Sequence, residues 1–192
     1  YWQHENLSGL TVIEGDALKF DFNQWSQQRS EKSGLCKVVG NLPYNISSPL
    51  LFHLVSAASH IDEQVFMLQA EVVERMVAQA GSSDFSRLSV MLQARYDMEL
   101  VLEVPPEAFE PAPKVNSAVV RMIPRRDFNL NDGQWSALEQ VVAAAFSQRR
   151  KMLRTNLQPF ASKLKLSEDE LKARAQDISV DRYIEWAKLL AN

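Results

Sequence analysis

The chain has 192 residues, of which 46% are hydrophobic, and a formal net charge of −3. It is long enough for one large domain or two modest ones. The slightly acidic balance argues against binding nucleic acid over the whole surface but permits a local basic patch. The single cysteine excludes an internal disulfide framework and a multi-cysteine metal site, and the three histidines lack metal-ligand spacing. No apolar run is long enough to span a membrane and the start does not resemble a signal peptide, so we predict a cytoplasmic protein without metal or membrane contact.

Strand-like and helix-like segments alternate over the first two thirds of the chain. Apolar and β-branched runs predict strands at residues 10–13, 37–39, 65–68, 98–104 and 117–123. Helical spacing of apolar residues predicts helices at residues 48–58, 72–77 and 88–94. This alternation predicts an α/β fold with a largely parallel sheet and helices on both faces. The last two strands have no helix between them and should pair antiparallel at one edge.

In the remaining part of the chain, the sequence pattern predicts helices and no strands. Apolar side chains keep a helical spacing from Trp135 to Leu157, and segments near Leu171 and Ile184 are also helical. We therefore predict two units, an α/β domain over residues 1–126 and an all-helical domain over residues 127–192.

The stretch VVGNLPYNIS places Asn41, Leu42, Pro43 and Tyr44 directly after a predicted strand. Ligands of open α/β sheets lie beyond the carboxyl ends of strands, and Pro43 restrains the backbone there. The Asn41 side chain and the Leu42 carbonyl offer two hydrogen-bond acceptors, and Tyr44 offers a flat apolar face. Together they suit a planar ring that carries an exocyclic amine. The alternative is an ordinary strand-to-helix turn, in which Asn, Pro and Tyr are all common.

Asn41-Leu42-Pro43-Tyr44 resembles the signature of S-adenosylmethionine-dependent adenine methyltransferases, in the leucine variant typical of ribosomal RNA adenine dimethyltransferases. Further segments agree with this resemblance, namely residues 15–17, 104–109, 111–121 and 146–151. As a set, these motifs make residues 10–191 similar to the small-subunit ribosomal RNA adenine dimethyltransferase family, of the KsgA or RsmA type.

The resemblance implies a Rossmann-like class I methyltransferase sheet, followed by a small helical RNA-binding domain. It implies S-adenosylmethionine as cofactor and dimethylation of the exocyclic amines of two adjacent adenosines in small-subunit (16S) ribosomal RNA, with a role in ribosome biogenesis. The implied partner is this RNA or the immature small ribosomal subunit.

Carried over by position, the resemblance implies that Asn41 and the Leu42 carbonyl bind the adenine amine, with Pro43 holding the turn. Tyr44 would stack on the base, and Phe109 would close on its other face. Without the resemblance, Phe109 is explained equally well as a core residue.

The resemblance also implies that Asp16, Ala17 and Asn41 contact the cofactor. Taken alone, Asp16 is an ordinary turn residue. A second feature is a run of six basic residues without an acidic one, consisting of Arg149, Arg150, Lys151, Arg154, Lys163 and Lys165. Such a run is usually a solvated helix face, but in an acidic chain it is the natural surface for phosphates. We predict that RNA contacts the first four of these side chains.

The start of the sequence departs from the family pattern. No glycine-rich turn of the E-x-G-x-G type precedes Leu10, so the sequence begins where the third strand of such a domain is expected. We therefore expect a partial methyltransferase domain, a segment at residues 10–13 that lacks its ladder partner, and no methyl transfer by this chain alone. The alternatives are a non-catalytic RNA- or ribosome-binding module and a methyltransferase for DNA adenine or protein glutamine.

Overall fold

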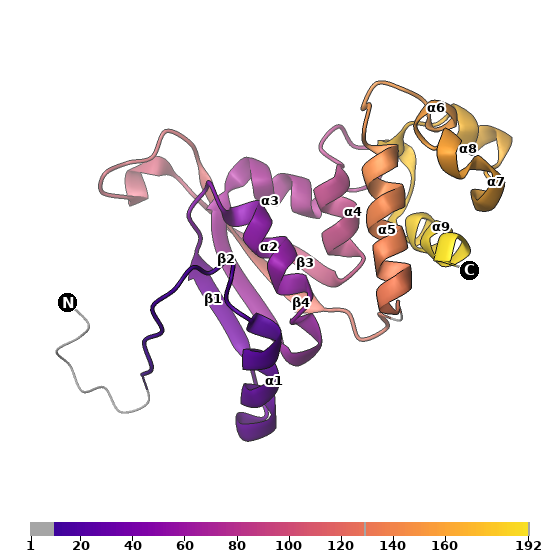
Figure 1. Ribbon diagram of the computed structural model, residues 1–192. Helices are drawn as coiled ribbons and strands as arrows, with labels where there is room; N and C mark the ends of the chain where they lie inside the picture. Colours follow the sequence, from indigo (N-terminus) through magenta and orange to yellow (C-terminus); the bar gives the residue numbers. More distant parts are fainter. Residues whose placement is uncertain (1–9, 129, 192) are drawn as a thin grey trace.

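The computed structural model describes residues 10–128 and 130–191 (Figure 1). Its sheet has the order β1-β2-β4-β3, with strands β1 (Lys37–Asn41), β2 (Glu63–Gln69), β3 (Tyr96–Val104) and β4 (Ser117–Pro124). β1 and β2 run parallel, whereas β4 is antiparallel to both β2 and β3. The expected antiparallel pairing of the last two strands is confirmed. The expectation of a largely parallel sheet is wrong, because the loop between β3 and β4 has no crossover helix and returns β4 into the sheet antiparallel to its neighbours.

The strand predicted at residues 10–13 is also wrong. These residues have no regular secondary structure, and Leu10, Val12 and Ile13 are exposed. Among the described residues β1 pairs only with β2, so no strand is paired with its outer edge. A β-branched sequence without a neighbouring strand has no partner for its backbone hydrogen bonds. Within the described residues, no strand pairs with this segment.

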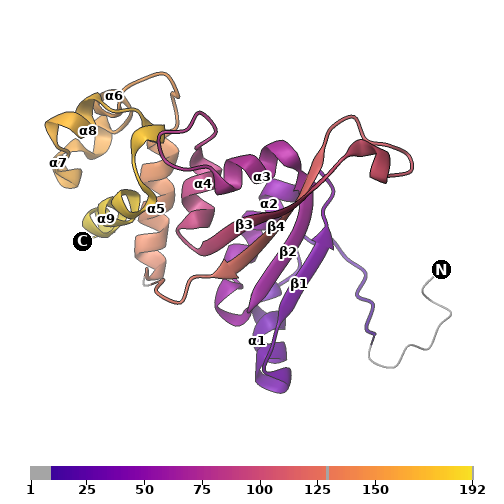
Figure 2. The same ribbon diagram turned by 180° about the vertical axis from the view of Figure 1, so that it is seen from behind.

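Helices cover one face of the sheet rather than two. The helices of this part are α1 (Phe22–Ser33), α2 (Ser47–Val55), η2 (Ala58–His60), α3 (Ala70–Val77), α4 (Arg87–Gln93) and η3 (Pro106–Ala108). Figure 2 shows the opposite face with no helix in front of the strands. On β2 every second residue is buried, including Phe66 and Leu68, which pack with Leu51 and Leu54 of α2. Successive side chains of a strand point to opposite faces of the sheet, so only the side chains on the face that the helices cover are buried.

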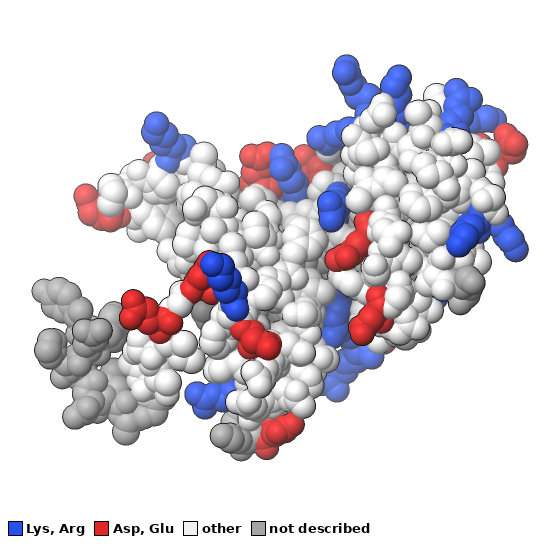
Figure 3. Space-filling view, in the orientation of Figure 1, with Lys and Arg blue, Asp and Glu red and all other residues white. Residues whose placement is uncertain are grey.

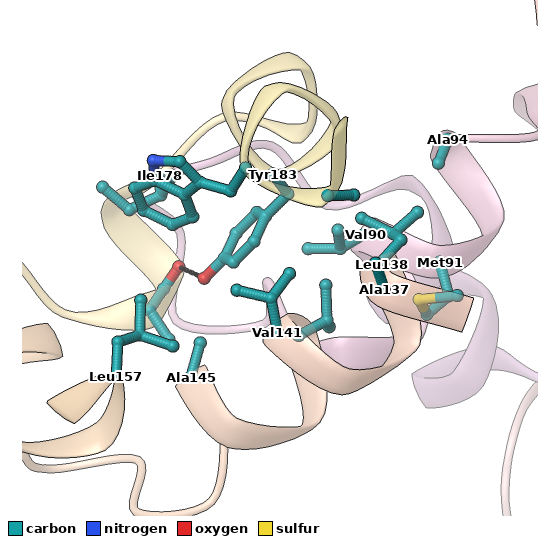
Figure 4. Packing of buried hydrophobic residues seen from close by; sticks show 14 of the residues in the cluster. Val90, Met91, Ala94, Ala137, Leu138, Val141, Ala145, Leu157, Ile178 and Tyr183 are labelled. Atoms are coloured by element: carbon teal, nitrogen blue, oxygen red, sulfur yellow. Dashed lines mark hydrogen bonds between the residues drawn. The ribbon is translucent and has the colours of Figure 1, made fainter. Parts of the chain in front are cut away.

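Every named element of the C-terminal part is a helix among the described residues, and Met152 and Arg174 form an isolated antiparallel β-bridge. Its elements are α5 (Asp132–Ala145), α6 (Leu153–Asn156), η4 (Gln158–Phe160), α7 (Ala161–Leu164), α8 (Glu168–Lys172), η5 (Ala175–Asp177) and α9 (Val180–Ala191). Tyr183 and Trp186 of α9 are fully buried, and Tyr183 points toward α5 in Figure 4. The Tyr183 hydroxyl donates to the Ala175 carbonyl at 2.8 Å, so its one polar atom is satisfied inside the core.

Helix α4 links the two parts. Val90, Met91 and Ala94 pack in the core of α5 and α9, whereas Leu92 packs with the sheet. A second link is the Gly81 backbone, whose amide donates to the Gln176 carbonyl at 2.7 Å. The division at residues 126 and 127 remains a prediction, and the cores on either side of it meet at α4.

Candidate active site and RNA-binding surface

The Asn-Leu-Pro-Tyr turn is anchored to the end of β2. The Leu42 amide donates to the Met67 carbonyl at 3.1 Å, and the Ile46 amide closes the turn on the Pro43 carbonyl at 3.1 Å. Leu42 is buried, while Asn41 is exposed at the carboxyl end of β1. A side chain at Gly40 would place its Cβ 3.0 Å from the Leu42 side chain. Glycine therefore allows Leu42 to fold back over the strand and hold the turn.

Two acceptors of this turn are free within the part of the chain that the structure describes. The Asn41 side chain makes no hydrogen bond there, and no donor reaches the Leu42 carbonyl. Two acceptors without a protein partner, on a turn that is hydrogen-bonded to β2, can accept from a ligand without first breaking a protein contact. Chemically, the pair can accept both hydrogens of one amine.

Tyr44 is held at both its backbone and its side chain. Its hydroxyl lies 2.8 Å from the Ser117 Oγ, and the Ser47 hydroxyl donates to its carbonyl at 3.1 Å. The residue as a whole nevertheless stays 37% exposed, which leaves surface for stacking. Sequence reasoning considered only the ring and missed Ser117. The only sequence signal was a serine at the start of a strand, which does not indicate a partner 73 residues away.

Phe109 lies in the loop between β3 and β4, just after η3, and is half-buried. This loop projects beyond the end of the sheet in Figure 1. Among the aromatic contacts of the described residues, none joins Phe109 to Tyr44. The structure does not bring the two predicted stacking rings into contact, and the role of Phe109 stays a prediction.

Asp16 and Ala17 line a cavity of about 420 Å³ beside the outer edge of β1. Phe20, Trp25 and Val39 supply apolar walls, and the volume is in the range of small-molecule sites. The Asp16 Oδ1 accepts the Leu18 amide at 2.9 Å, so one carboxylate oxygen already stabilises the turn. Asn41 is not among the lining residues. The residues present fit an adenosyl group in size and in apolar character, with Asp16 as the acidic group at the cavity.

The basic residues do not share one helix, contrary to the helical spacing expected from Trp135 to Leu157. α5 ends at Ala145 and α6 begins at Leu153, so Arg149, Arg150 and Lys151 lie in the turn between them. All three are exposed, as is Arg154 on α6. In Figure 3 the basic side chains gather along the upper edge of the helical part. We call residues 149–151 the basic turn.

Three hydrogen bonds from two side chains hold the basic turn in place. The Asn156 Nδ2 donates to the Ala145 carbonyl at 2.6 Å and to the Gln148 carbonyl at 3.1 Å. Arg149 donates to the Ser83 carbonyl, which lies in the loop between α3 and α4. Arg149 is therefore engaged across the two parts of the chain. Sequence reasoning missed Asn156, because a buried asparagine on a short helix has no pattern of its own.

Comparison with known proteins identifies the family. The model of a family described as ribosomal RNA adenine dimethylase matches residues 3–192. The chain belongs to the ribosomal RNA adenine dimethylase family. A ribosomal RNA small subunit methyltransferase A from Burkholderia lata is 54% identical over 184 residues, which are 95% of this chain and 66% of that protein. Its namesake from Bordetella pertussis is 55% identical over 183 residues, 94% of this chain and 66% of that protein.

The chain thus spans about two thirds of the length of these curated members of the family. A crystal structure of a dimethyladenosine transferase from Plasmodium falciparum superimposes with a TM-score of 0.75 at 25% identity, covering 93% of this chain and 71% of that one. The family resemblance and the methyltransferase fold class are confirmed.

No helix within residues 10–128 and 130–191 is long and apolar enough to cross a membrane. In the same described residues, no group of three or more His, Cys, Asp or Glu side chains could hold a metal ion.

Proposed function

We propose that this chain carries the base-binding turn and an RNA-binding surface of an S-adenosylmethionine-dependent methyltransferase. Its substrate is the exocyclic amine of two adjacent adenosines in small-subunit ribosomal RNA, and its role lies in ribosome biogenesis. One observation carries the proposal: in a chain of this family, the turn at the end of β1 holds two acceptors that have no partner among the described residues, followed by a partly exposed, anchored tyrosine.

The acceptors address the chemical difficulty of this substrate. An adenine amine is a weak nucleophile because its lone pair is delocalised into the ring. Accepting both amine hydrogens, on the Asn41 Oδ1 and the Leu42 carbonyl, favours a geometry in which the lone pair is localised on nitrogen. S-adenosylmethionine, when bound, supplies an electrophilic methyl group. The protein contributes position and preorganised dipoles rather than a strong base.

The aromatic side chains address a second difficulty, which is access to the base. A base inside a helix or loop stack must leave its neighbours to enter a pocket. Stacking on the Tyr44 ring compensates for part of that loss, and Phe109 is proposed to cover the other face. Asp16 and Ala17 are proposed to contact the adenosyl part of the cofactor, together with Asn41 from the end of β1.

The acceptor pair can be tested by binding. A stem-loop with two adjacent adenosines is compared with one in which both adenines are replaced by purine, which lacks the amine. Loss of one neutral hydrogen bond weakens binding by roughly fivefold, so the chain should prefer adenine and Asn41→Ala should lose most of that preference. Asn45→Ala, an exposed asparagine of the same turn, is the matched control. Equal affinity of the unaltered chain for both RNAs would refute the proposal.

The basic turn is tested separately through its salt dependence. Arg150→Glu with Lys151→Glu should lower the slope of log affinity against log salt by about 1.4 to 1.8, because each of the two phosphate contacts adds about 0.7 to 0.9. Arg149 is left intact because it contacts Ser83. Arg126→Glu, an exposed arginine outside the turn, should leave the slope unchanged if contact is local. An unchanged slope in the double variant would show that the turn is only a solvated surface.

A further inference from the structure

The hydroxyl of Tyr44 has a partner that stacking alone does not require. It lies 2.8 Å from the Ser117 Oγ, and Ser117 is only 1% exposed. A buried hydroxyl is costly unless it is hydrogen-bonded. The pair therefore satisfies Ser117 and at the same time ties the tip of a partly exposed ring to the interior of the sheet.

Ser117 and the turn that carries Tyr44 are both hydrogen-bonded to the end of β2. Ser117, the first residue of β4, pairs with Gln69 at the end of β2, and the Ala70 amide donates to the Asn116 carbonyl at 2.9 Å. The turn that carries Tyr44 is attached two residues earlier on β2, at the Met67 carbonyl. The hydroxyl contact closes a loop of interactions that runs from β1 through β2 to β4.

We propose that Ser117 is a positioning residue, which fixes the plane of the Tyr44 ring for the target base. The inference rests on the proposed function of the turn. A tyrosine side chain has two rotatable bonds, and a contact at the hydroxyl restrains both. With the ring already in place, less conformational freedom is lost when a base stacks on it. Ser117 also directly follows the loop that carries Phe109, so the same residue ties the second proposed stacking element to the first.

This role makes the hydroxyl of Tyr44 matter, although stacking itself needs only the ring. Tyr44→Phe keeps the ring but frees its tip and leaves the Ser117 hydroxyl without its partner. Ser117→Ala frees the tip without leaving that buried hydroxyl behind. Each variant should therefore weaken base stacking, and combining them should add little, because both remove the same contact.

The readout is the ratio of affinities for two RNA stem-loops, one with the adenines present and one abasic at those positions. Stacking of a base on an aromatic ring is worth roughly a fivefold to hundredfold ratio. Tyr44→Ala should reduce the ratio to near one. Tyr44→Phe, Ser117→Ala and the double variant should each reduce it by about two- to tenfold, the size of one hydrogen bond. Ser117→Thr keeps a hydroxyl and should restore much of the ratio.

The outcomes separate this inference from the proposed function. A ratio near one for the unaltered chain would refute base binding itself. A normal ratio that Tyr44→Ala abolishes but Ser117→Ala leaves intact would refute the positioning role and keep the base-binding turn. If Ser117 were merely structural, Ser117→Ala would weaken binding of both RNAs equally and lower the urea midpoint without changing the ratio. Ser48→Ala, on a neighbouring half-buried serine whose side chain makes no hydrogen bond among the described residues, is the matched control.

Discussion

Asn156 is the residue whose removal should most clearly loosen the basic turn. The residue is only 7% exposed, and its side chain donates to two backbone carbonyls, one at the end of α5 and one in the segment that leads to Arg149. Asn156→Ala removes both hydrogen bonds. Because the Thr155 side chain next to it is exposed and makes no hydrogen bond among the described residues, Thr155→Ala serves as the matched control.

The size of the effect follows from these contacts. Two neutral hydrogen bonds contribute a net of about 1–3 kcal/mol. The Asn156 Oδ1 is buried without a partner, so deleting it recovers part of that loss. We therefore expect Asn156→Ala to lower the free energy of unfolding by about 2 kcal/mol. Asn156→Asp should cost at least as much, because a buried carboxylate would then face two carbonyl oxygens.

Urea unfolding, followed by the fluorescence of the tryptophans, measures this loss as a lower midpoint at constant slope. Thr155→Ala should change the free energy by less than about 0.5 kcal/mol. The folded Asn156→Ala chain should also bind RNA more weakly than the Thr155→Ala chain. A loss of stability no larger than that of the control would refute the idea that the amide holds the turn.

Three more outcomes are expected. The Arg182 side chain is hydrogen-bonded to Glu170 and holds the pKa of that carboxyl below its usual range, so the pair should stabilise the fold fully above about pH 4.3. Acid titration should show this contribution to stability disappearing as the pH falls through the lowered pKa. In Glu170→Gln, stability should fall less over that pH range. Gly40→Ala should cost about 1 kcal/mol in urea unfolding, because the new Cβ would lie 3.0 Å from the Leu42 side chain; a neutral result would show that Leu42 moves freely. Burial raises the pKa of the Cys36 thiol, so iodoacetamide should modify it slowly in buffer and quickly in urea, and equal rates would contradict its burial.

Local sequence determined most of the elements near the site. Residues 65–68 and 117–123 form strands as predicted, because their apolar runs are buried on the face that the helices cover. The family motif also located the turn correctly, since Pro43 and the glycine before Asn41 act on the backbone next to them. Helix α1 was not predicted, because it contributes few apolar residues, such as Phe22 and Trp25, to the core.

Tertiary structure alone decided the features that depend on distant partners. The position of β4 between β2 and β3 and the failure of residues 10–13 to form a strand both depend on which neighbours are available for hydrogen bonding. The Tyr44 contact with Ser117 and the Arg149 contact with Ser83 join residues 73 and 66 positions apart. Periodicity and turn propensity act over a few residues, so they located the turn that is proposed to bind the base but could not show what holds its tyrosine ring in place.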